Sequence, residues 1–528
     1  MKRLGSLTLF VFAVALLHAV ATVPFPLPDR WTTFAASASL MSADLLVLLG
    51  FVVMVANAGA PRRAAHGASI GLLVATLFRA ANGYFVANYD RPFELSDTKN
   101  AWGLWHYLLH DSSTGEAIAK SVAAALAVFA VHVLLAWCFA RVARAGASRG
   151  GITAAIVLQA VVLVGAFAAP WHPSSFAALV AELGRTVTAS DARFQQSVAA
   201  GKQRMASVPH DLRGLAGADV HVVFVESYGR VAIDHPQVSP RVTALWSDLA
   251  PQLAVAGFEV RTVLCRPAIR GGASWIAHAQ FFAGARIDHQ RGWELLLRSD
   301  LTPLPKVFAD AGYETVEVMP AMDRHWPAGQ AFFGFTASLT QIELGYRGTR
   351  YHWGQMPDQF ALHHLLRSVV EPATKPLFTT FMSVTSHTPF RRVPPYFADW
   401  KIDDRSFAVP PLREHDEVPW NGVGEPEIVV PAYLDTLEHT LRSVTGFVCR
   451  LTRPSIVIVL GDHQPPFANS LHPPDPSFDV PMHVFTNRPE LVAQLAGLGL
   501  ARGFAPAPGT EGFDTAIFAP EFLRLFSK

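Results

Sequence analysis

Long apolar stretches separated by short polar segments fill the first third of the chain. They cover residues 4–23, 40–58, 68–86, 118–140 and 152–169. Each has close to the about 20 apolar residues that an α-helix needs to cross the hydrocarbon core of a bilayer. Polar side chains interrupt two of them, His18 in the first stretch and Arg79 in the third. The pattern predicts five transmembrane helices within residues 1–169.

Basic residues between the apolar stretches predict how the helices are oriented. They precede the first stretch, separate the second from the third, and separate the fourth from the fifth: Lys2, Arg3, Arg62, Arg63, Arg141, Arg144 and Arg149. Cytoplasmic loops are enriched in Lys and Arg, so these segments are expected in the cytoplasm and everything after Ala169 outside it. A cleaved signal peptide is the alternative for the first stretch. It is disfavoured because no clear small-residue cleavage site precedes Pro24 and further apolar stretches follow.

The pattern changes in the second part of the chain, where short apolar runs alternate with stretches of helical spacing. The runs cover residues 220–226, 258–264, 315–319, 377–384, 455–460 and 482–485. Such alternation predicts a largely parallel sheet flanked by helices. Residues 213–528 are therefore expected to form one α/β domain. Residues 170–212 are expected to form a connecting segment with a helix over residues 176–205.

Charge and cysteine content add little to this picture. The formal net charge is +1, so no basic excess indicates a nucleic-acid partner. Of the three cysteines, Cys138 falls in the fourth apolar stretch, whereas Cys265 and Cys449 belong to the α/β domain. An oxidising compartment would permit these two to pair, and the sequence leaves that open.

Metal-binding side chains follow two of the predicted strands. Glu226 ends the run VVFVE, and Asp462 and His463 end the run IVIVLGDH. Continuous runs of β-branched residues are typical of strands buried on both faces of a parallel sheet, and such sheets bind ligands beyond the carboxyl ends of their strands. We therefore expect these three side chains to form one metal site.

A candidate nucleophile lies in the segment RGGASWIAH, residues 270–278. Its glycines permit a tight loop that opens into a helix, and the helix start offers N–H groups and a positive dipole end to an anion. Ser274 stands at that start. A divalent cation would lower the pKa of its hydroxyl and so activate it. An ordinary helix N-cap is the alternative for this serine.

In this order, the segments resemble the alkaline phosphatase superfamily. They are most similar to its membrane-anchored sulfatase-like branch, which includes lipoteichoic acid synthases, phosphoglycerol transferases and phosphoethanolamine transferases. Glu226 matches the first metal ligand of that branch, and GDH at residues 461–463 matches its metal-binding motif. Ser274 matches the nucleophile because Gly284 follows it by ten residues, as in sulfatases. Residues 383–390 (SVTSHTPF) resemble the segment whose histidine, here His387, contacts the phosphate or the leaving group.

The chain also departs from the pattern of its relatives. Arylsulfatases have two adjacent acids at the first strand, whereas Glu226 is followed by Ser227. Residues 265–270 (CRPAIR) approach the sulfatase C-x-P-x-R motif but place the arginine one residue late, which we interpret as coincidence. The transferases normally use threonine where this chain has Ser274. His278 occupies the position of a sulfatase arginine, four residues after the nucleophile, and is a candidate for binding the transferred group.

The resemblance implies a ligand set of Glu226, Ser274, Asp462 and His463, with three oxygens and one nitrogen. That mixture suits one divalent ion, Zn²⁺ or Mn²⁺. His387 is the candidate for protonating the leaving group or binding an anion. Further candidates for substrate binding, each with a structural role as the alternative, are Asp358, His352, Arg324 and His483.

The resemblance also implies a function and a location. The chain is expected to move phosphoglycerol or phosphoethanolamine from a phospholipid donor to a glycan or lipid acceptor of the cell envelope, through a covalent intermediate on Ser274. It would be a multi-pass protein of a bacterial-type inner membrane with its catalytic domain on the periplasmic side. Two alternatives stay open: a sulfatase or phosphodiesterase that uses water, and a non-catalytic protein of envelope assembly.

Overall fold

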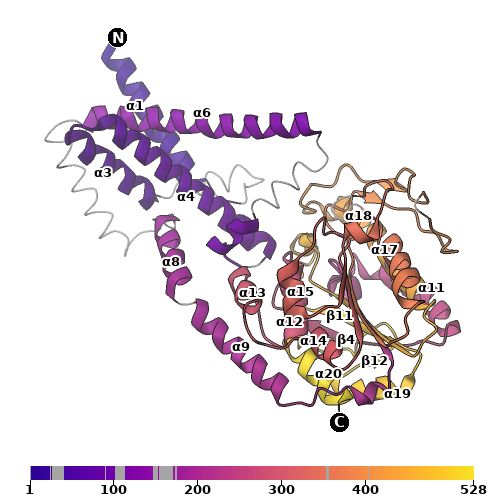
Figure 1. The fold of residues 1–528 in the computed structure, drawn as a ribbon. Coiled ribbons are helices and arrows are strands. Elements are labelled where there is room, and N and C mark those ends of the chain that lie inside the picture. The colour runs from indigo at the N-terminus through magenta and orange to yellow at the C-terminus, as the bar shows by residue number, and fades with distance from the viewer. Residues whose placement is uncertain are drawn as a thin grey trace. The chain divides into compact units, whose positions relative to one another are not determined.

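The structure is a computed structural model that describes residues 2–23, 25, 41–89, 91–100, 113–146, 153, 171–172, 175–188, 190–351, 356–403 and 405–527. The chain divides into two compact units, unit 1 (Met1–Ala189) and unit 2 (Ser190–Lys528). Figure 1 shows the helices of unit 1 in indigo to magenta and the sheet domain of unit 2 in magenta to yellow.

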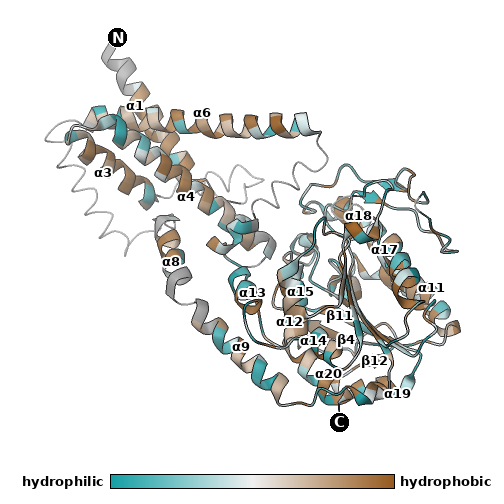
Figure 2. Ribbon diagram, viewed as in Figure 1, coloured by the Kyte–Doolittle hydropathy of each residue, from teal (hydrophilic) through white to brown (hydrophobic). Residues whose placement is uncertain are grey.

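Unit 1 is helical. Within its described residues, the long apolar helices are α1 (Lys2–Thr22), α3 (Ala43–Asn57), α4 (Pro61–Tyr89) and α6 (Thr114–Gly146). The segments Pro61–Val86 and Thr114–Ala145 are long and apolar enough to cross a membrane, whereas Thr8–Thr22 and Ala43–Asn57 are shorter apolar helices. Hydrophobic residues predominate along α3 and much of α6 (Figure 2). The fifth predicted span, residues 152–169, lies outside the described residues except for Thr153, so five spans are not confirmed.

The remaining described elements of unit 1 are short. They are β1 (Met41–Ser42), which pairs in parallel with β2 (Trp171–His172), the 3₁₀ helix η1 (Leu95–Asn100) and the helix α8 (Ser175–Thr188). The predicted connecting helix over residues 176–205 is two helices, α8 in unit 1 and α9 (Ser190–Ala206) in unit 2.

Unit 2 is built on a nine-stranded sheet. Its order is β12 (Ala501–Arg502), β4 (Glu259–Arg266), β11 (Val480–Thr486), β10 (Ser455–Gly461), β3 (Asp219–Val225), β7 (Leu377–Met382), β5 (Glu314–Val318) and β6 (Ala337–Leu339), with β13 (Phe513–Asp514) beside β4. All six predicted strands are present. Because β11 is antiparallel to both β10 and β4, and β12 is antiparallel to β4, these two strands run opposite to the other seven. The sheet is therefore mixed, with a parallel half from β10 to β6.

Helices cover both faces of this sheet (Figure 1). Besides α9 they are α10 (Val231–Asp234), α11 (Ser239–Val255), α12 (Ser274–Ala283), α13 (Gln290–Leu296), α14 (Leu304–Asp310), α15 (Pro327–Phe333), α16 (Gln341–Leu344), α17 (Asp358–Leu365), α18 (Pro426–Val448), α19 (Pro489–Gln494) and α20 (Phe518–Phe526). A separate two-stranded sheet pairs β8 (Arg392–Val393) with β9 (Arg413–Glu414) in antiparallel orientation. Single helical turns are η2 (Arg213–Leu215), η3 (Leu366–Val370), η4 (Pro466–Ser470), η5 (Leu495–Leu498) and η6 (Thr515–Ile517).

Two apolar clusters form the core of unit 2, one on each face of the sheet. In β3, Val223 and Val225 belong to the cluster that includes α11, α17 and α18, whereas Val222 and Phe224 belong to the cluster that includes α12, α14 and α20. Successive side chains of a strand point to opposite faces, so a strand buried on both sides is apolar at every position. The continuous apolar runs in the sequence therefore mark the central strands.

All three cysteines are free. Cys138 and Cys265 are buried and Cys449 is half-buried. The pairing of Cys265 with Cys449, left open by the sequence, is not present.

Candidate active site

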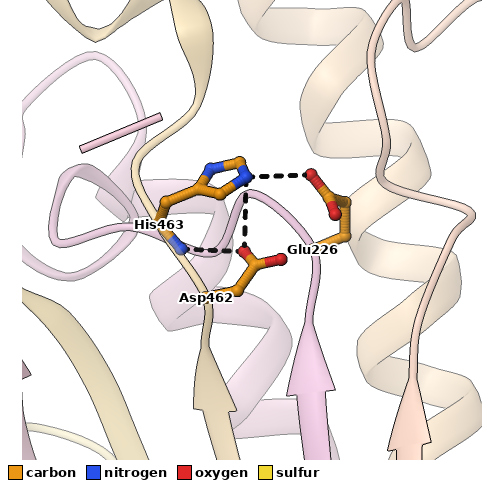
Figure 3. A group of neighbouring side chains, drawn as sticks. All are labelled: Glu226, Asp462 and His463. Carbon is orange, nitrogen blue, oxygen red and sulfur yellow. Dashed lines mark hydrogen bonds and ion pairs between the residues drawn. The ribbon is translucent and has the colours of Figure 1, made fainter. Parts of the chain in front are cut away.

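The parallel pairing of β3 with β10 brings the predicted metal ligands together. Val225 lies opposite Gly461, so Glu226 and Asp462 leave the same edge of the sheet side by side. Gly461 is required for this approach because a Cβ there would lie 1.9 Å from the carbonyl oxygen of Tyr228. Figure 3 shows Glu226, Asp462 and His463 pointing toward one another beyond the two strand ends.

These three buried side chains form a compact donor set. One ligand atom from each of Glu226, Asp462 and His463 lies within 4.8 Å of the others. The Nε2 atom of His463 is 3.3 Å from Oε1 of Glu226, and its Nδ1 is 2.8 Å from the carbonyl oxygen of Gln464. A proton on Nδ1 donated to that carbonyl leaves the lone pair of Nε2 for a metal ion.

Ser274 is the first residue of α12, as predicted. The turn before it includes Gly272 and Ala273, whose φ angles are +58° and +54°. The Ser274 hydroxyl donates to Oε2 of Glu226 at 3.0 Å, and its Oγ is 3.2 Å from Nε2 of His463. The turn therefore directs the hydroxyl into the donor set.

The charges in this donor set depend strongly on one another. Burial, and then the negative charge of Glu226, raise the pKa of Asp462 to about 8. Burial also opposes the charged form of Glu226, but the positive charges of His387 and His463 outweigh it and lower the pKa of Glu226. Burial lowers the pKa of His463, but the two carboxylates outweigh it and raise that pKa to about 9.

A divalent cation fits this arrangement. Two buried carboxylates without a cation must share protons, whereas the ligands of a metal ion are deprotonated. Two carboxylates, one imidazole and a hydroxyl form a mixed oxygen and nitrogen set of the kind that suits Zn²⁺ or Mn²⁺.

His387 belongs to the segment that follows β7. A positive charge at His387 would lower the pKa of Glu226. The same segment contacts the backbone of Glu226 directly: the N–H of Glu226 donates to Ser383 Oγ at 2.9 Å, and Ser386 Oγ donates to the Glu226 carbonyl at 2.7 Å. His387 is therefore tied to the donor set through its own segment.

His278 lies one helical turn after Ser274. Its ring packs on Phe224 with centroids 4.1 Å apart, and its buried Nε2 has no hydrogen-bond partner. That atom is 3.9 Å from Oδ2 of Asp462. Burial lowers the pKa of His278 to about 3, so the imidazole is neutral at neutral pH. A polar atom without a partner beside the donor set is suited to a ligand oxygen.

Asp358, predicted to bind substrate, is fully engaged within the protein. Its Oδ1 accepts the N–H of Val384 at 2.8 Å, and its Oδ2 accepts the N–H of Thr385 at 3.2 Å and the hydroxyl of Thr440 at 2.7 Å. This arrangement argues against contact with a substrate. It indicates that Asp358 holds the segment that carries His387.

The other three residues predicted to bind substrate are His483, Arg324 and His352. His483 is buried, and its ring nitrogens lie 2.9 Å from the Tyr228 hydroxyl and 2.7 Å from Thr262 Oγ1, so neither is left for a substrate. The Arg324 side chain is 70% exposed and pairs with Asp323. His352 lies outside the described residues.

Sequence reasoning missed the residues that support the donor set. Ser227, Ser383 and Ser386 each donate a hydrogen bond to Glu226 or accept one from it. In the sequence, these serines are distinguished only by their positions next to the predicted strand ends.

Part of the candidate site belongs to a segment that matches a protein-family model. Residues 278–489 match the Sulfatase family model. This part of unit 2 is similar to sulfatases. The match confirms the predicted relationship to sulfatases; it includes His387, Asp462 and His463 and begins four residues after Ser274. No curated protein matches the chain.

The chain is also similar to several solved structures, at low identity. The phosphoethanolamine transferase EptA of Neisseria meningitidis is 14% identical, with a TM-score of 0.44, over 92% of this chain and 96% of EptA. The lipoteichoic acid synthase LtaP of Listeria monocytogenes is 12% identical, with a TM-score of 0.38, over 58% of this chain and 72% of LtaP. The phosphoglycerol transferase GacH of Streptococcus pyogenes, solved with sn-glycerol-1-phosphate, is 13% identical, with a TM-score of 0.36, over 56% of this chain and 75% of GacH.

Proposed function

We propose that this protein is a membrane-anchored, metal-dependent phosphotransferase. It moves phosphoglycerol or phosphoethanolamine from a phospholipid to a glycan or lipid of the cell envelope. The observation that carries the proposal is the position of Ser274, whose hydroxyl oxygen is within hydrogen-bond distance of both Glu226 and His463. A hydroxyl inside a buried donor set at a helix start is suited to attack a phosphodiester.

Glu226, Asp462, His463 and the Ser274 hydroxyl would hold one divalent cation, Zn²⁺ or Mn²⁺. When bound, the ion supplies positive charge that favours the ionised hydroxyl and the charge of the transition state. The match to the Sulfatase family supports this assignment.

In the first half-reaction, Ser274 Oγ, ionised after releasing its proton to solvent, attacks the phosphorus of the lipid phosphodiester. A bond forms between Oγ and phosphorus, and the bond from phosphorus to the diacylglycerol oxygen breaks. His387 donates a proton to that leaving oxygen. The N–H groups at the start of α12 and the Nε2 of His278 face the oxygens of the transferred group.

In the second half-reaction, an acceptor alcohol attacks the phosphorus from the side that diacylglycerol has left. His387, now without its proton, accepts the proton of the alcohol. The bond from phosphorus to Ser274 breaks and the serine oxygen leaves in its ionised form, ready for the next turnover. The group is thereby transferred with no net change in the enzyme.

A lipid donor is consistent with the apolar helices of unit 1. A catalytic domain tied to a membrane meets its lipid substrate at the surface where that lipid resides. We place the protein in a bacterial-type inner membrane, with unit 2 on the periplasmic side where envelope acceptors are found.

The intact mass of the detergent-purified protein tests the proposal. The wild type and Ser274→Ala are incubated with Zn²⁺ or Mn²⁺ and mixed phospholipids that include phosphatidylglycerol and phosphatidylethanolamine. We expect an added phosphoglycerol or phosphoethanolamine mass on the wild type only. Ser443→Ala is a matched control, because Ser443 is another buried serine whose hydroxyl donates to a backbone carbonyl within α18.

Other outcomes point to other functions. Bound metal without an adduct, together with release of the headgroup phosphate into solution, would favour a hydrolase of the same superfamily. An absence of both metal and adduct would favour a non-catalytic role in envelope assembly.

A further inference from the structure

Ser227, the residue directly after Glu226, has an unusual backbone conformation. Its φ angle is +60°, in the left-handed region that residues with a Cβ rarely adopt, and its side chain is fully buried. A glycine would take this conformation more easily. Where a residue other than glycine adopts it beside a functional site, the side chain is a candidate for the reason.

The left-handed turn lets Ser227 contact both carboxylates of the donor set. Its N–H donates to Oδ1 of Asp462 at 2.9 Å, and its hydroxyl donates to Oε1 of Glu226 at 3.1 Å. Its carbonyl accepts the hydroxyl of Tyr433 at 2.9 Å, which fixes the turn from α18. One residue thus links the ligands that follow β3 and β10.

The contact to Glu226 also distinguishes the two oxygens of that carboxylate. Oε1 faces the hydroxyl of Ser227 and the Nε2 of His463, whereas Oε2 accepts the hydroxyl of Ser274. A carboxylate held by one oxygen cannot rotate freely, so the other oxygen keeps its direction toward the nucleophile.

We propose that Ser227 is a positioning residue of the metal centre, which orients Glu226 with its hydroxyl and Asp462 with its N–H. The inference rests on the proposed metal-dependent function. The inference goes beyond that function because it assigns the orientation of two ligands to a residue that binds neither metal nor substrate. Ser383 and Ser386 contact only the backbone of Glu226, so they cannot set the rotation of its carboxylate.

Two substitutions separate the role of the hydroxyl from that of the backbone. Ser227→Ala and Ser227→Gly both remove the hydroxyl, but only glycine relieves the left-handed conformation. We expect both variants to bind Zn²⁺ and Mn²⁺ about 10- to 100-fold more weakly than the wild type, the usual effect of removing a partner of a metal ligand. The measurement is competition with a chromophoric chelator on the full-length protein in detergent, without any substrate.

Thermal unfolding of the metal-free proteins provides the readout for folding. We expect the metal-free Ser227→Gly variant to unfold at a temperature no lower than that of Ser227→Ala, although both bind metal weakly. Ser443→Ala, which removes a buried hydroxyl in α18, is expected to bind metal like the wild type.

The outcomes distinguish this inference from the proposed function. If the wild type itself binds neither Zn²⁺ nor Mn²⁺, the proposed metal centre is wrong. If the wild type binds metal and both Ser227 variants bind it equally well, Ser227 does not position the ligands and only the inference is overturned. If Ser227→Ala weakens metal binding and Ser227→Gly does not, the backbone conformation rather than the hydroxyl is responsible. That result would also overturn the inference.

Discussion

At the scale of single residues, buried side chains outside the donor set support the candidate site. Asp358 shows this most clearly, because its carboxylate accepts two backbone N–H groups and a hydroxyl and has no oxygen directed elsewhere. The segment it holds carries His387 and contacts Glu226. A buried acid at a distance from the chemistry therefore controls the position of the proposed general acid.

Replacing this carboxylate by an amide tests that role. In Asp358→Asn, an NH₂ group replaces one acceptor and leaves a buried backbone N–H unpaired, which costs about 1–3 kcal/mol of unfolding free energy. Displacement of His387 is expected to lower turnover by about 10- to 100-fold. Urea unfolding and headgroup transfer measure the two effects. Unchanged turnover in a destabilised variant would show that Asp358 supports folding only.

His483 gives a prediction of pH dependence. Burial lowers its pKa to about 3, whereas a histidine in the unfolded chain protonates near pH 6.5. The stability that His483 contributes is therefore complete above pH 6.5 and is lost as the pH falls toward 3, by about 1.4 kcal/mol per pH unit. Between pH 6.5 and 5, the unfolding free energy of the wild type should fall more steeply than that of His483→Gln. The difference between the two slopes should approach about 1.4 kcal/mol per pH unit. Parallel urea-unfolding series in detergent measure it, and identical slopes would contradict the prediction.

The sequence predicted that Glu226, Asp462 and His463 would lie together, but it did not predict the residues that support them, for a physical reason. Glu226, Asp462 and His463 follow apolar runs, so their place at the sheet edge follows from strand chemistry. The role of Ser227 depends on a backbone angle that the sequence does not reveal. His483 was assigned to the substrate because it lies in a late strand, but β11 runs antiparallel to β10, and its side chain is enclosed by Tyr228 and Thr262.

At the scale of elements, the site is made by the close approach of β10 to the turn after β3. Gly461 is the point of contact, since a Cβ there would lie 1.9 Å from a backbone oxygen. Gly461→Ala is expected to lower the unfolding free energy by about 3 kcal/mol or more and to displace Asp462. Gly497→Ala is the matched control, because nothing lies within 4 Å of a Cβ at that position. Urea unfolding of the two variants decides the point, and equal stabilities would show that the turn can move.

The strands were predicted well where they are central and missed where they lie at the edges or are very short. Runs such as residues 455–460 are buried on both faces, and that burial requires apolar residues at every position. The missed strands of the nine-stranded sheet, β6, β12 and β13, have two or three residues each, too few for any pattern to appear. The connecting helix was predicted as one because its apolar spacing continues from α8 into α9.

At the scale of the whole molecule, the number of spans decides on which side unit 2 lies. The basic residues Lys2 and Arg3 predict that the N-terminus lies in the cytoplasm. Four crossings by α1, α3, α4 and α6 would return the chain to the cytoplasm, where envelope acceptors are absent. The proposed function therefore requires a fifth crossing, which the apolar stretch at residues 152–169 is long enough to provide.

Labelling of the native Cys449 tests this topology, because no cysteine has to be introduced. It is half-buried in unit 2, whereas Cys138 and Cys265 are buried, so it is the thiol most accessible to a reagent in water. Burial raises the pKa of the Cys449 thiol, so labelling with a membrane-impermeant maleimide is carried out at about pH 8. We expect labelling in right-side-out vesicles, little in inside-out vesicles, and none beyond background in Cys449→Ser. The reverse pattern would place unit 2 in the cytoplasm and would exclude the fifth crossing. A periplasmic acceptor would be excluded with it, even if Ser274 still accepted a headgroup from lipid in detergent.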